Sequence, residues 1–220
     1  MRGYDAVPAQ LFPVFLDLEH RPVVLVGGGT VAAAKLGQLL DVRADVRVVA
    51  PEVHADIEAA GVRVERRGFA PADLDGAWLV VAAATPEVNR QVAAAARSRR
   101  VFVNAVDDPV HASAYLGGVV RRAGVTIAIS TGGTAPALAG LLREAIDGLL
   151  PPRDLALWMS VAVRQRRTWR RDRVPMERRR PLLLEALNAL YRGARRARDD
   201  GGWTTRPSIP WLYAPEDSWL

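Results

Sequence analysis

The chain contains no cysteine and a single lysine, Lys35. Without cysteine it has no disulfides, no thiolate metal ligands and no cysteine nucleophile, which fits a cytoplasmic enzyme. The three histidines are far apart in the sequence, so we expect no resident metal site. The chain also lacks an uncharged apolar run of the roughly 18 residues that a membrane span needs. Its first residues show no signal-peptide core, so we expect no membrane partner.

The 220 residues are 50% hydrophobic and 25% charged, a composition typical of a globular protein with a sizeable core. The net charge of +6 is almost entirely arginine and is concentrated at 164–198. We interpret this region as the solvated faces of two helices, at 154–170 and 175–197, with contact to an anionic ligand as the alternative. No nucleic-acid-binding motif accompanies the charge, so we expect no nucleic-acid partner.

Short apolar runs alternate with helix-compatible segments over the first half of the chain. This alternation predicts an α/β fold, a doubly wound parallel sheet. A segment at 12–18 precedes it, which we expect to pack on the sheet edge. Two strand-like runs then predict a hairpin rather than another crossover, and helices follow. We expect strands at 23–26, 44–50, 62–65, 77–84 and 101–103, hairpin strands at 114–121 and 124–130, and helices at 30–40, from 51, at 86–99 and from 136 to about 150.

A glycine-rich turn, Gly27-Gly28-Gly29, lies between the first strand and the first helix. The spacing Gly27-x-Gly29-x-x-Ala32 fits the dinucleotide-binding fingerprint of Rossmann-like folds. Gly27 would allow the tight turn, and Gly29 would let the backbone approach a pyrophosphate. That group would lie on the N–H groups of the helix that starts at Thr30. The alternative is a turn that serves the fold alone.

Polar residues follow the later strands, where open α/β sheets bind ligands. Glu52 follows the second strand and could bind the adenosine ribose; since no arginine takes its place, NAD is favoured over NADP. The alternative is a charge in the first turn of a helix. Thr85 and Asn104 follow the fourth and fifth strands, with capping or turn roles as the alternative.

Two further segments could carry chemistry. Asp107 lies in the sequence Asp107-Asp108-Pro109, where a carboxylate could act as a general base or belong to an ordinary turn. A second anion site, or a capped helix start, is predicted where hydroxyl groups and glycines open a helix. Its residues are Ser130, Thr131, Gly132, Gly133 and Thr134.

These motifs, in this order, resemble those of the precorrin-2 dehydrogenase/sirohydrochlorin ferrochelatase family, which also forms the N-terminal part of sirohaem synthases. The resemblance is collinear over about residues 11–152. It rests on the segments Phe12–Phe15, Val26–Lys35, Val49–Glu52, Ala82–Thr85 with Asn89, Val103–Asp107 and Ile127–Pro136.

The resemblance implies NAD-dependent oxidation of precorrin-2 to sirohydrochlorin and, in some members, insertion of ferrous iron as a second substrate. Thr30, Val31, Pro51 and Glu52 would contact NAD, with Asn104 nearby, and Asp107 would be the catalytic aspartate. The carboxylate-bearing tetrapyrrole would be bound near the Ser130–Thr134 loop. Thr131 stands where some relatives carry a phosphorylatable serine. An intertwined homodimer is also implied.

The implied domains are an NAD-binding Rossmann domain at 1–112, a dimerisation and substrate region at 113–152, a helical domain at 153–198 and an extended aromatic tail at 199–220. The tail and the glycines at 117–118 depart from the family pattern. Two other function classes stay open. One is a non-catalytic NAD sensor, which would not need Asp107. The other is a scaffold that presents the tail to a partner.

Overall fold

The structure, a computed structural model, describes residues 11–196. The tail expected at 199–220 lies outside the described residues. Within them the chain divides into two compact units, one of residues 11–118 with 129–141 and the other of residues 119–128 with 142–196.

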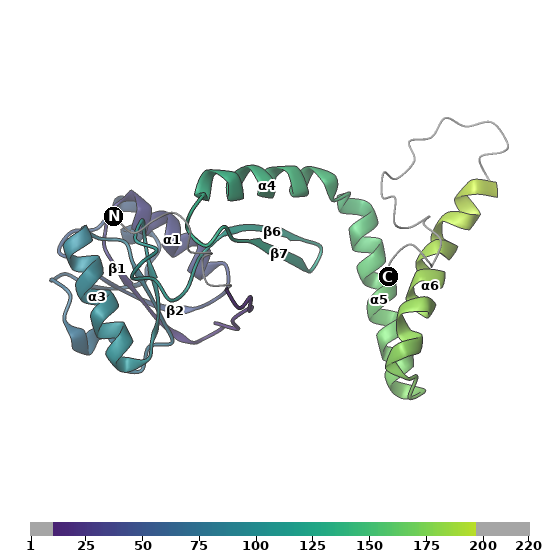
Figure 1. The fold of residues 1–220 in the computed structure, drawn as a ribbon, viewed down its shortest axis with the longest axis horizontal. Helices are drawn as coiled ribbons and strands as arrows, with labels where there is room; N and C mark the ends of the chain where they lie inside the picture. The colour runs from purple at the N-terminus through teal and green to yellow at the C-terminus, as the bar shows by residue number, and fades with distance from the viewer. Residues whose placement is uncertain (1–10, 197–220) are drawn as a thin grey trace, which may run out of the picture. The chain divides into compact units, whose positions relative to one another are not determined.

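The first unit, in which Figure 1 labels β1, β2, α1 and α3, is built on a five-stranded sheet of order β3-β2-β1-β4-β5, and every neighbouring pair of strands is parallel. This confirms the Rossmann-like doubly wound fold. The order places β1 and β4 side by side at the centre, so the loops that follow them meet at the carboxyl edge of the sheet. The strands are β1 Pro22–Val26, β2 Asp45–Val49, β3 Arg63–Glu65, β4 Leu79–Ala82 and β5 Phe102–Ala105.

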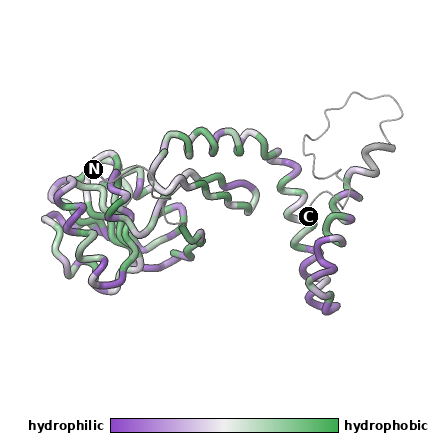
Figure 2. Tube along the Cα trace, in the orientation of Figure 1, coloured by the Kyte–Doolittle hydropathy of each residue, from purple (hydrophilic) through white to green (hydrophobic). Residues whose placement is uncertain are grey.

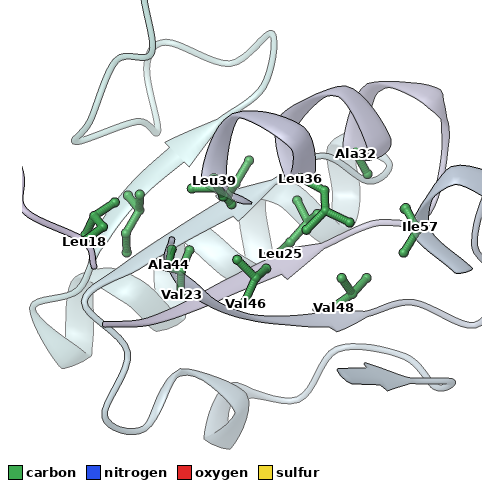
Figure 3. Packing of buried hydrophobic residues seen from close by; sticks show 12 residues of the cluster. Leu18, Val23, Leu25, Ala32, Leu36, Leu39, Ala44, Val46, Val48 and Ile57 are labelled. Carbon is green, nitrogen blue, oxygen red and sulfur yellow. The ribbon is translucent and has the colours of Figure 1, made fainter. Parts of the chain in front are cut away.

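Helices cover both faces of this sheet because successive strand residues point to opposite sides. In β1, Val23 and Leu25 pack against α1 (Thr30–Leu40) and α2 (Ala55–Ala59), as Figure 3 shows. Val24 and Val26 pack against α3 (Pro86–Arg99) and the short 3-10 helix η1 (Pro71–Leu74). Each fully buried aliphatic side chain contributes about 1.5–3 kcal/mol. The sheet is therefore a rigid support for the loops at its carboxyl edge.

The helix expected from Pro51 begins later. Pro51 and Glu52 form a bend, and α2 starts at Ala55, where the His54 side chain accepts a hydrogen bond from the Asp56 amide. The bend is fixed by the glycine loop, since the His54 amide donates to the Gly28 carbonyl at 2.7 Å. A tertiary contact thus overrides the local preference of proline for a first helical turn.

The segment before β1 contributes less to the core than we expected. Leu18 is buried in the cluster under α1, but Phe12 and Phe15 are 88% and 72% exposed. The expected packing on the sheet edge is therefore wrong for these two rings.

The second unit contains most of a hairpin and the later helices. The hairpin strands β6 (Gly118–Arg122) and β7 (Val125–Ile129) turn at Ala123 and Gly124, both with positive φ, as a type I′ hairpin turn requires. Helix α4 (Pro136–Leu149) follows, and Arg122 holds it by a bidentate ion pair with Asp147. The hairpin, predicted from residue 114, starts four residues later.

Helices α5 (Pro152–Arg171) and α6 (Met176–Arg196) pack through Leu155, Trp158, Val161 and Leu187. The Trp158 indole donates to the Tyr191 hydroxyl at 2.7 Å. Figure 2 shows a strongly hydrophilic stretch where α5 turns into α6. Most arginine side chains of this stretch are exposed, in agreement with the expected solvated faces. Among the described residues, no helix has the length and apolarity that crossing a membrane requires.

Candidate functional site

The glycine loop follows β1 at the carboxyl edge of the sheet, and each glycine meets a different constraint. Gly27 has φ +126°, and a Cβ there would lie 2.2 Å from the Ala83 carbonyl oxygen that follows β4. A Cβ on Gly28 would lie 1.8 Å from the Glu52 carbonyl oxygen. Both glycines are therefore required by backbone segments of the protein itself.

Gly29 differs from its two neighbours because a Cβ there would meet nothing within 4 Å. It is the N-cap of α1 with extended backbone, and no side chain caps the helix. The first turn of α1 also has no acidic residue. The loop therefore leaves open space in front of backbone N–H groups at the positive end of a helix dipole, which is the arrangement that binds a pyrophosphate.

The other residues predicted for a nucleotide lie around this loop. Thr30 and Val31 form the exposed start of α1, and Pro51 and Glu52 form the exposed bend next to Gly28. Thr85 is exposed and caps α3, since its hydroxyl accepts a hydrogen bond from the Val88 amide at 3.4 Å. The structural role that we considered for Thr85 is thus present.

Asn89 in the first turn of α3 and Asn104 in β5 are buried, and the side chain of each bonds to backbone groups. The Asn89 side chain accepts from the Ala84 amide at 3.0 Å and donates to the Val106 carbonyl at 3.5 Å. The Asn104 side chain donates to the Ala114 carbonyl at 3.0 Å. Asn89 therefore connects the loop beside Gly27 to the residue before Asp107.

A pocket of about 330 Å³ lies beside Asp107 in the first unit. Asp107 is exposed and has φ +58°, a left-handed conformation that aspartate tolerates better than most residues. Asn104 lines the same pocket, as do Ser130, Thr131 and Gly133 from the loop before α4. The structure thus brings the predicted general base together with the second predicted anion loop.

The Ser130–Thr134 loop is held by its own hydroxyl groups. The Ser130 hydroxyl accepts from the Gly132 amide, the Thr131 hydroxyl accepts from the Ala135 amide, and the Thr134 hydroxyl donates to the Thr131 carbonyl at 2.6 Å. Gly132 and Gly133 have positive φ, and a Cβ on Gly133 would lie 2.8 Å from Pro109. The loop therefore packs directly on the Asp107 segment.

Among the ionisable residues that line the pocket, Lys35 and Tyr115 were not expected as site residues, and Asp108 was expected only as a neighbour of Asp107. The Asp108 carboxylate pairs with the His111 imidazole at 2.7 Å, and the Tyr115 hydroxyl donates to the Pro109 carbonyl at 2.9 Å. Burial lowers the pKa of the Lys35 ammonium, and the Asp107 carboxylate opposes this change. Two features of the sequence could have identified Lys35 as a site residue: it is the single lysine of the chain, and it lies in the segment that carries the glycine motif.

Comparison with known families gives two matches. Residues 14–118 match a family described as "Putative NAD(P)-binding", and residues 122–149 match the "Sirohaem biosynthesis protein central" family. The first match spans the sheet and the glycine loop, so this chain has an NAD(P)-binding domain.

Curated relatives agree with these matches. Siroheme synthase 1 of Aeromonas hydrophila is 44% identical over 144 residues, which are 63% of this chain and 31% of the relative. Siroheme synthase of Photorhabdus laumondii is 38% identical over 184 residues, which are 81% of this chain and 39% of the relative. The chain thus spans about a third of the length of the curated relatives it matches.

A solved structure covers more of the fold. The protein described as "SirC, precorrin-2 dehydrogenase" is 27% identical, with a TM-score of 0.60, and the match covers 80% of this chain and 88% of that one. A TM-score of 0.60 over this share of both chains shows that the two proteins have the same overall fold. The chain therefore belongs to the family of the sirohaem synthase N-terminal module, with its NAD(P)-binding and central domains, and resembles SirC.

Proposed function

We propose that this protein oxidises precorrin-2 to sirohydrochlorin, with NAD as the hydride acceptor. The observation that carries the proposal is the pocket in which Asp107 lies beside Asn104 and the Ser130–Thr134 loop, on the sheet edge where the glycine loop also lies. The name of the solved relative gives the same reaction.

NAD fits the glycine loop on two structural grounds. Gly29 leaves room for a pyrophosphate, and the uncapped start of α1 offers N–H donors to it. Thr30 and Val31 would lie against the phosphates, and Glu52 would bind the adenosine ribose hydroxyls. The acidic side chain at that place favours NAD over NADP. When bound, the nicotinamide supplies a two-electron acceptor for hydride.

Asp107 would remove the proton that leaves as the ring system is oxidised. The substrate then loses one hydrogen as hydride and one as a proton, so the two-electron change is balanced. The left-handed backbone at Asp107 and the Asn104 bond to Ala114 hold this segment in one geometry. A base that is positioned in this way contributes about 10²- to 10⁴-fold to a rate.

The Ser130–Thr134 loop would bind a carboxylate of the substrate at the N-terminus of α4. Its hydroxyl groups and glycine amides lie at the positive end of that helix dipole. The Thr131 side chain accepts the Ala135 amide at the start of α4, so a phosphate on Thr131 would add acceptor oxygens at this helix N-terminus and compete with a substrate carboxylate for it. Phosphorylation of Thr131 would therefore change the pocket.

A second copy of the chain would complete the protein as a homodimer. The support is an apolar stripe on α4 that stays exposed: Leu138 is 50% exposed, Leu141 64%, Leu142 42% and Leu149 69%. These positions share one face of the helix. Contact with an equivalent stripe would remove it from water.

Turnover with purified protein tests the proposal. Precorrin-2 with NAD should give sirohydrochlorin and NADH, faster than with NADP, and Asp107→Asn should abolish most of this rate. NAD binding without turnover of precorrin-2 would instead support a non-catalytic sensor. A second arm, with sirohydrochlorin and ferrous iron but no NAD, tests iron insertion as an additional activity.

A further inference from the structure

The lysine of this chain lies in the Asp107 pocket without a direct partner. Lys35 is in the second turn of α1, is partly buried, and lines the pocket together with Asp107. Among the residues whose side chains the structure describes, 11–191, none forms a hydrogen bond or ion pair with its ammonium group. A partly buried cation without a partner costs stability unless something else offsets its charge.

The other polar side chains of the pocket do not pair with this cation. Asp108 is already paired with His111, and the Tyr115 hydroxyl is bound to the Pro109 carbonyl. Asp107 is close enough to raise the pKa of Lys35, but burial has the larger effect and the net pKa is lowered. The pocket therefore presents one ammonium group that a bound anion would stabilise.

The position of Lys35 favours a substrate group over the pyrophosphate. It lies five residues beyond Thr30, which is about 7.5 Å along the helix axis from the end where phosphate binds. The lining of the pocket includes residues 104–109 and 115–118 but none of the glycine loop. A carboxylate carried by the substrate would reach this ammonium next to Asp107.

We propose that Lys35 binds one carboxylate of the substrate and thereby positions the macrocycle edge beside Asp107. This inference rests on the proposed function for the identity of the substrate. Lys35 is a positioning and specificity residue: it selects an acidic macrocycle and takes no proton from the reacting atoms. Binding of the carboxylate offsets the charge that burial penalises, so the ligand raises the pKa of Lys35.

Because the chain has a single lysine, amine labelling reports on this residue without activity. Labelling with acetic anhydride, measured by mass spectrometry on the peptide that contains Lys35, should begin at lower pH than for free lysine. Sirohydrochlorin should slow the labelling about tenfold or more and move its pH midpoint upward, whereas NAD alone should do neither. Equal labelling with and without sirohydrochlorin, or full protection by NAD alone, would overturn the proposal.

Variants give a second, kinetic readout. Lys35→Met keeps the apolar stem but not the charge, so KM for precorrin-2 should rise about tenfold or more, with a smaller change in kcat. Lys35→Arg should recover part of the loss, and Gln38→Met on the exposed side of α1 is the matched control. An unchanged KM in Lys35→Met would contradict the inference.

The two proposals fail in different ways. If wild-type protein does not oxidise precorrin-2 while sirohydrochlorin still protects Lys35, the function is wrong and the binding role stands. If wild-type protein turns over normally and Lys35→Met retains its KM, the function stands and the role of Lys35 is wrong. A thermal unfolding temperature of Lys35→Met at or above that of wild type excludes a folding defect.

Discussion

Alanine at Gly29 should separate nucleotide binding from folding, because the structure gives the three loop glycines different constraints. Gly29 has φ −80° and ψ −173°, which alanine adopts freely, and its Cβ would project into open space. Alanine is a poorer N-cap than glycine by up to about 1 kcal/mol. It also lowers the entropy of the unfolded chain, worth about 0.4–1 kcal/mol in the opposite direction. The net stability change should stay within about 1 kcal/mol.

The effect on binding should be much larger. A Cβ at Gly29 fills the space that a pyrophosphate would use, so at least one charge-assisted hydrogen bond from the helix N-terminus is lost. Such a bond contributes about 1.5–3 kcal/mol, which corresponds to a rise in Kd of about 10- to 150-fold. Isothermal titration calorimetry with NAD measures this change, and thermal unfolding measures stability on the same samples.

Gly27→Ala is the matched control for folding. It forces alanine to φ +126° and brings its Cβ to 2.2 Å from the Ala83 carbonyl oxygen. Backbone strain and overpacking together should cost about 2–6 kcal/mol, a large part of the stability of a typical domain. If Gly29→Ala binds NAD like wild type, or unfolds as readily as Gly27→Ala, the assignment of the open space to a pyrophosphate is refuted.

Three other perturbations test separate parts of the protein. Asp107→Asn keeps the side-chain shape at φ +58° but removes the proposed general base. The kcat for precorrin-2 oxidation, measured by stopped-flow, should fall about 100-fold or more, while the Kd for NAD, measured by calorimetry, should be unchanged. Hydrogen bonds from Arg67 are the largest cause of the lowered pKa of the Asp73 carboxyl group. The ionised Asp73 therefore stabilises the fold fully above the ordinary aspartate pKa of about 4, and this stabilisation is lost as the pH falls through the lowered pKa. Asp73→Asn should therefore destabilise the protein by about 1–3 kcal/mol at neutral pH. In acid, the free energy of unfolding of this variant should depend less on pH than that of the wild type. Leu141→Glu places a charge on the exposed stripe of α4, so light scattering should show a shift from dimer to monomer; an unchanged mass would argue against that interface.

The sequence predicted best those elements whose boundaries are set locally. Helices α1 and α3 begin and end where expected, since a glycine turn precedes one and Thr85-Pro86 opens the other. The sheet was also expected, because its central strands β1 and β4 are buried on both faces and are continuous apolar runs. Local signals of this kind need no knowledge of distant contacts.

Errors arose where long-range contacts decide the backbone. Proline at 51 suggested a helix start, but the Glu52 carbonyl packs on Gly28 and delays α2 to Ala55. The hairpin was predicted too early because Ser113 and Ala114 bond to Val103 of β5 instead of to a hairpin partner. Nothing in the sequence around these residues records those partners.

The site was predictable as a set of residues but not as a geometry. Asp107, Asn104 and the Ser130–Thr134 loop were expected from motifs, and the structure places them around one pocket. Lys35 was not expected there, since α1 is far from Asp107 in the sequence. Only the packing of α1 against the sheet brings its second turn to this pocket.

The buried amide of Asn89 sets the spacing between the two halves of the site. Its two hydrogen bonds join Ala84, next to the strand end that packs on Gly27, to Val106, next to Asp107. This side chain therefore fixes the distance between the glycine loop and the Asp107 segment, both of which belong to the first unit. The separation between these two segments is thus set by the buried core of the first unit, and redesign of the Ser130–Thr134 loop would leave it unchanged.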